Sequence, residues 1–198
     1  GFFPVEDLPT FRHIDSYLQG HPNMNTVPGV DMSTGSLGQG VSVATGMALA
    51  AKYTGKANRV YSLLGDGEIQ EGQVWEACML ASHYKLDNLC VIVDNNNLQI
   101  DGDIRKVMNP HPIDKKLEAF GFHVEVIDGH DFDAIEQALN TARTVKGQPS
   151  AIIMKTVKGK DVSFMENDAG WHGKGPNDAE CETAMNELRA ALAELEAE

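Results

Sequence analysis

Residues 61–72, YSLLGDGEIQEG, run from an apolar stretch directly into Gly65-Asp66-Gly67. The apolar part, residues 59–64 (RVYSLL), has the β-branched and aromatic side chains typical of a strand that is buried on both faces of a parallel sheet. A second such run, residues 89–94 (LCVIVD), leads into three consecutive asparagines. The sequence therefore predicts two buried strands that each end on polar side chains.

The rest of the chain repeats this strand pattern in alternation with helices. Two further strands are expected at 122–127 and 150–155, and helical patterns are expected at 36–53, 70–85, 112–120 and 131–145. Such alternation predicts right-handed βαβ units. We therefore expect an α/β fold, with a doubly wound, mostly parallel sheet covered by helices on both faces.

The C-terminal part of the chain has a different pattern. Residues 178–197 have apolar side chains at helical spacing, and Asn177 or Asp178 is the expected N-cap. A Gly-rich loop, residues 158–177, precedes this helix and is long enough to suggest a functional role. No repeat or linker divides the sequence, so one domain over residues 1–198 is expected.

Composition excludes several classes of protein. Lys and Arg number 16 against 29 Asp and Glu, a net charge of −13, which disfavours non-specific binding to nucleic acid or an anionic membrane. No apolar run reaches the roughly 20 residues that a membrane span needs. Cys78, Cys90 and Cys181 include no CxxC pair, which argues against a disulfide framework and a zinc site and favours a reducing, cytoplasmic location.

The polar strand ends indicate a binding site. In open α/β sheets, ligands bind beyond the carboxyl ends of the strands, where both Asp66 and the asparagine run 95–97 are expected. The 27 residues between Gly67 and Asn95 suffice for one crossover helix, so the two strands can be parallel neighbours. A carboxylate, an amide and a backbone carbonyl suit Mg²⁺ and leave coordination positions for a diphosphate. Each motif alone is more often a simple turn, but the two together favour a cofactor site.

Three segments extend this pattern to a known family. They are 65–102 (GDGEIQEGQVWEACMLASHYKLDNLCVIVDNNNLQIDG), 20–40 (GHPNMNTVPGVDMSTGSLGQG) and 170–176 (GWHGKGP). Together they resemble transketolase, in the form whose N-terminal, thiamine diphosphate-binding subunit is a separate chain. The resemblance covers nearly the whole sequence and implies the thiamine diphosphate-binding fold, with residues 1–198 forming a diphosphate-binding (PP-type) domain that lacks its N-terminal segment.

The resemblance also implies roles for particular residues. The metal ligands would be Asp66, Asn96 and Leu98, the last through its carbonyl. Further cofactor contacts are implied for Gly35, Ser36, Leu37, Gly67, Ile100 and His172. Catalytic roles near the substrate are implied for His21 and His172, and the counterparts of Glu71 and Glu76 lie at the subunit interface of the family.

Each of these residues also has a simpler interpretation. A lone histidine is more often structural than catalytic. Glu71 and Glu76 are five positions apart, which is not a same-face helical pair, so surface charge is the alternative. One departure from the family is Asp161, where relatives usually have glycine.

The activity implied is transfer of a two-carbon ketol unit between sugar phosphates, in the pentose phosphate pathway, with thiamine diphosphate and Mg²⁺ or another divalent cation such as Ca²⁺. The family's ring-activating carboxylate has no match here, so the resemblance implies a homodimer of heterodimers that includes a separate C-terminal, pyrimidine-binding subunit. Other thiamine diphosphate enzymes remain alternatives, such as deoxyxylulose phosphate synthase or the dehydrogenase component of a 2-oxo acid complex. So does a non-catalytic, truncated binding module.

Overall fold

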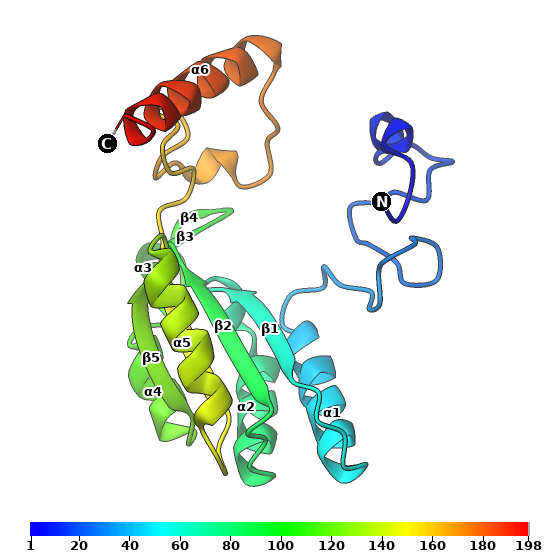
Figure 1. The fold of residues 1–198 in the computed structure, drawn as a ribbon, viewed down its shortest axis with the longest axis vertical. Coiled ribbons are helices and arrows are strands. Elements are labelled where there is room, and N and C mark those ends of the chain that lie inside the picture. Colours follow the sequence, from blue (N-terminus) through cyan, green and yellow to red (C-terminus); the bar gives the residue numbers. More distant parts are fainter. Residues whose placement is uncertain (198) are drawn as a thin grey trace.

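A four-stranded parallel sheet forms the centre of the molecule in a computed structural model, which describes residues 1–197. The strand order is β1-β2-β6-β5 (Figure 1). The bounds are β1 Val60–Gly65, β2 Leu89–Asn95, β5 His123–Asp128 and β6 Ser150–Lys155. All four lie within one residue of the predicted strands, which confirms the parallel α/β sheet.

Helices cover both faces of this sheet, as the sequence predicted. On one face, α1 (Gly40–Tyr53), α2 (Gly72–His83) and α4 (Ile113–Ala119) pack on the larger apolar core. On the other face, α5 (Phe132–Thr144) packs on a smaller cluster. Alternate strand residues face the two sides: Val91 and Ile153 belong to the larger core, whereas Cys90 and Ile152 belong to the smaller one.

Two of the predicted helices begin later than the sequence patterns indicated. Helix α1 begins at Gly40, so the expected start at residue 36 is wrong. The reason is that Gly35 and Gly38 have φ angles of 113° and 79°, which a right-handed helix does not allow. Helix α2 begins at Gly72 because Glu71 is still extended.

Shorter elements gather where the parallel strands end. The pair β3 (Leu98–Gln99) and β4 (Gly102–Asp103) forms an antiparallel hairpin directly after β2. Helix α3 (Ile104–Val107) follows the hairpin. Three short 3-10 helices complete the set of short elements: η1 (Val5–Thr10), η2 (Glu68–Gln70) and η3 (Ala169–Trp171).

The two ends of the chain lie on the side of the sheet where the strands finish (Figure 1). Helix α6 (Asp178–Leu195) begins with a complete capping box in which Asn177 and Glu180 exchange hydrogen bonds, which identifies Asn177 as the predicted N-cap. None of the residues of α6 is buried. Within residues 1–197, no helix is both long and apolar enough to cross a membrane.

Candidate functional site

Asp66 lies at the carboxyl end of β1, beside the asparagine run that ends β2. The strands pair in parallel, with Gly65 opposite Asp94, and the Asp66 N–H donates to the Asp94 carbonyl over 3.1 Å. The Asp66 side chain is almost fully buried. Its Oδ2 accepts hydrogen bonds from the Asn95 amide at 2.9 Å and from the Asn97 backbone N–H at 2.6 Å. The two polar strand ends therefore meet, as the parallel pairing of their strands requires.

The electrostatic surroundings of Asp66 suit a cation. Burial raises the pKa of this carboxyl above its ordinary value of 3.8, and hydrogen bonds from Asn95, Asn97 and the Gly67 backbone offset only part of the effect. Among the described residues, no lysine, arginine or histidine forms an ion pair with it. A buried carboxylate with hydrogen-bond donors on one oxygen can offer the other to a metal ion.

The next asparagine along the chain has different partners. Asn96 donates from its amide nitrogen to the Asp94 carboxylate at 3.1 Å, and its Oδ1 accepts from the Leu98 N–H at 3.0 Å. The second Asp94 oxygen accepts from the Thr156 hydroxyl at the end of β6. Asn96 and Leu98 thus lie on the turn that contacts Asp66, and their role as metal ligands stays a prediction.

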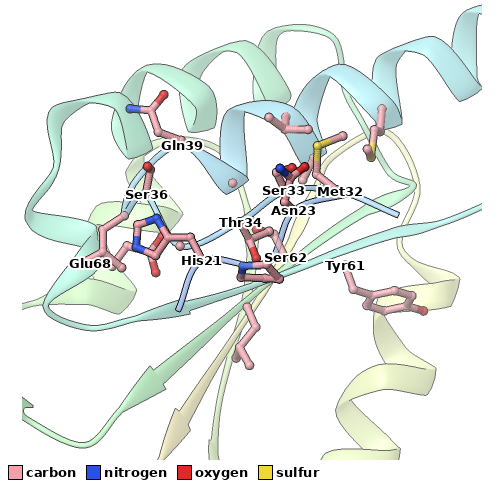
Figure 2. A pocket seen from close by; sticks show the side chains of 18 of the residues that line it. His21, Asn23, Met32, Ser33, Thr34, Ser36, Gln39, Tyr61, Ser62 and Glu68 are labelled. Atoms are coloured by element: carbon pink, nitrogen blue, oxygen red, sulfur yellow. The ribbon is translucent and has the colours of Figure 1, made fainter. Parts of the chain in front are cut away.

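A cavity of about 760 Å³ lies between the N-terminal segment, α1 and β1. Its lining includes Gly35, Ser36 and Leu37 together with His21, and Figure 2 shows the imidazole beside this loop. The contact is close, because a methyl group placed on Gly35 would lie 2.5 Å from the His21 ring. The structure therefore brings together a predicted catalytic histidine and the loop predicted to contact the cofactor.

Glu68 is part of this cavity, although no functional role was predicted for it from the sequence. One carboxylate oxygen accepts from the Gly38 N–H at 3.0 Å and the other from the Gly65 N–H at 3.1 Å. A sequence signal did exist, because a glutamate whose side chain reaches back to the N–H three residues earlier has the spacing of a capping box.

The two predicted interface carboxylates lie on α2. Glu71 is the extended residue before the helix, and a methyl group on Gly38 would lie 2.7 Å from the Glu71 Cβ. Glu76 is exposed on the same helix. An exposed position is compatible with an interface and equally with ordinary surface charge, so both roles stay predictions.

The remaining predicted residues are exposed around the hairpin. Ile100, between β3 and β4, is 67% exposed. His172 is exposed at the end of η3, which lies against β4, so it is on the same side of the sheet as Asp66. Asp161 has a φ of 66°, a backbone conformation in which glycine is the usual residue.

Comparison with known proteins gives a consistent result. Residues 2–192 match the family described as "Transketolase, thiamine diphosphate binding domain". One of the two subunits of an apulose-4-phosphate transketolase from Actinobacillus succinogenes is 43% identical over 189 residues, which cover 96% of this chain and 68% of the relative. A 6-deoxy-6-sulfo-D-fructose transketolase subunit of a Clostridium species is 42% identical over the whole chain and 70% of its own length.

Solved structures agree with the fold. The crystal structure of transketolase from Campylobacter jejuni superposes with a TM-score of 0.86 at 38% identity. The match covers 92% of this chain but only 29% of that protein. The chain therefore corresponds to one part of the longer enzyme.

Proposed function

Because this chain belongs to the transketolase thiamine diphosphate-binding domain family, we propose that it is the cofactor-binding subunit of a transketolase. It would act in the transfer of a two-carbon ketol unit from a ketose phosphate to an aldose phosphate. The observation that carries the proposal is Asp66, a buried carboxylate held by hydrogen bonds from the asparagine turn of the adjacent strand.

The residues present fit a divalent cation and a diphosphate. Asp66 would offer its second oxygen to Mg²⁺ or Ca²⁺, and we assign the other protein ligands to Asn96 and the Leu98 carbonyl. The Asp94 carboxylate holds the Asn96 amide nitrogen, which fixes which end of that amide faces away from it. Gly67 has no side chain, so its backbone can approach the diphosphate closely.

The ring end of the cofactor would lie in the cavity of Figure 2, against Gly35, Ser36 and Leu37. When bound, thiamine diphosphate supplies the nucleophilic carbon and the electron sink that ketol transfer requires. The protein's part is to orient this group and to move protons. We assign His21 and His172 to hydrogen bonds with substrate hydroxyls, from opposite sides of the strand ends.

The proposal includes a second subunit. The pyrimidine half of the site would come from a separate chain, in a homodimer of heterodimers, with Glu71 and Glu76 near the interface. Two relatives that are named as subunits of transketolases support this arrangement. The partner would also supply the carboxylate that activates the cofactor ring, and the complex would act on sugar phosphates in the cytoplasm.

The test combines the chain with the partner subunit encoded beside it, Mg²⁺ and thiamine diphosphate. We expect ketol transfer that needs all four components, measured by product analysis with a panel of phosphorylated ketoses. The panel includes apulose 4-phosphate and 6-deoxy-6-sulfofructose, the substrates in the relatives' names. Turnover with pyruvate as donor would instead indicate a deoxyxylulose phosphate synthase. Binding of partner and cofactor without turnover would indicate a non-catalytic module.

A further inference from the structure

Two segments that are distant in sequence contact each other through one side chain, Glu68. Its carboxylate oxygens accept from the N–H of Gly38 and from the N–H of Gly65, at 3.0 and 3.1 Å. Gly38 directly follows Leu37, and Gly65 directly precedes Asp66. The carboxylate therefore connects the loop at the cavity to the turn at the end of β1.

Neither N–H group has a partner within regular secondary structure. Gly38 precedes α1 and has a φ of 79°, so its N–H is not part of that helix. Strand β1 is at the edge of the sheet, and the Gly65 N–H donates to Glu68. Both bonds are charge-assisted, which makes them stronger than bonds between neutral groups.

We propose that Glu68 is a positioning residue that fixes the distance between the two halves of the cofactor site. This rests on the proposed function, in which residues 35–37 contact the ring system and Asp66 with Gly67 holds the metal and diphosphate. A rigid cofactor that binds both segments at once gains affinity when they are already in place, because ordering them on binding costs free energy. Glu68 acts through the backbone and does not itself need to touch the cofactor.

A single substitution separates this role from a general one. In Glu68→Gln only one terminal atom can accept, and the new NH₂ group faces an N–H donor, so one of the two bonds is lost. A hydrogen bond to a charged group contributes about 1.5–3 kcal/mol, which corresponds to a loss of cofactor affinity of roughly tenfold or more. We expect kcat at saturating cofactor to stay within about twofold, because Glu68 is not assigned a chemical role.

The experiment measures two quantities on the chain with its partner subunit. The first is the concentration of thiamine diphosphate, at fixed Mg²⁺, that gives half-maximal binding by calorimetry. The second is amide hydrogen exchange at Gly38 and Gly65 in the absence of cofactor, which reports the two bonds directly. Glu136→Gln, the same chemical change on the exposed face of α5, is the matched control.

We expect Glu68→Gln to weaken cofactor binding about tenfold and to speed exchange at Gly38 or Gly65, while the Glu136→Gln chain behaves as wild type. Unchanged cofactor affinity together with unchanged exchange would overturn the proposal. If Glu68→Gln does not fold, Glu68→Asp serves instead, because its shorter side chain reaches only one of the two amides. Exchange in Glu68→Asp at the wild-type rate would then overturn the proposal. The exchange measurement needs no turnover, so it stays informative if the ketol transfer assay fails.

Discussion

Replacing the buried carboxylate of Asp66 by an amide separates its structural role from its proposed metal role. In Asp66→Asn the side-chain oxygen can still accept from the Asn95 amide and the Asn97 N–H. These two bonds become neutral and each loses about 1 kcal/mol. The substitution also removes a charge whose burial is unfavourable, as the raised pKa of Asp66 indicates. The two effects oppose each other, so the cofactor-free variant should differ from wild type by less than about 1 kcal/mol in free energy of unfolding.

The response to cofactor should differ strongly. A ligand at 100 times its dissociation constant stabilises the folded state by about 2.7 kcal/mol. For a chain of this size that raises the midpoint of thermal unfolding by roughly 5–10 °C. The variant's NH₂ group cannot ligate a cation, so its midpoint should rise by less than about 1 °C under the same conditions.

The assay is thermal unfolding with and without Mg²⁺ and thiamine diphosphate, on wild type, Asp66→Asn and the control Asp133→Asn, which changes an exposed residue of α5. An equal rise of the midpoint in wild type and Asp66→Asn would refute the assignment of Asp66 to the metal. A cofactor-free variant that is less stable by more than about 3 kcal/mol would refute the argument that burial of the charge offsets the weaker bonds.

Three further predictions concern the backbone, the thiols and the last helix. Gly35→Ala should lower the free energy of unfolding by about 1–3 kcal/mol, measured in urea, because the φ of 113° strains any other residue; an unchanged value would show that the loop relaxes. Burial raises the thiol pKa of Cys78 to about 12 and of Cys90 to about 11, so at pH 8 a thiol reagent should label the exposed Cys181 alone. Labelling of all three at one rate in the native chain would contradict this burial. Asn177→Ala should cost about 1 kcal/mol and speed amide exchange in the first turn of α6 only, and exchange that speeds throughout the sheet would argue against a local cap.

The sequence allowed the sheet to be predicted closely, because each strand is an apolar run bounded by polar or turn residues. The start of α1 was missed because sequence composition does not reveal the positive φ angles of Gly35 and Gly38. The meeting of Asp66 with the asparagine turn follows from parallel pairing, and it was expected.

Which asparagine does what was harder to predict. Successive side chains of a strand point to opposite sides. Asn95 faces Asp66, whereas Asn96 turns to Asp94, and these directions depend on the register of β2 in the sheet. Glu68 escaped prediction for a related reason, since one of its two partners, Gly38, is 30 residues away.

The position of β1 at the edge of the sheet has a practical consequence. Leu63 is 70% and Tyr61 43% exposed on this strand. An edge strand with apolar side chains is a template on which another chain can add a strand, and proteins commonly shield such edges. Purified by itself, the chain should therefore aggregate as its concentration rises. Its charge of −13 should slow that process in dilute buffer and less so in high salt, which light scattering across a salt series would measure.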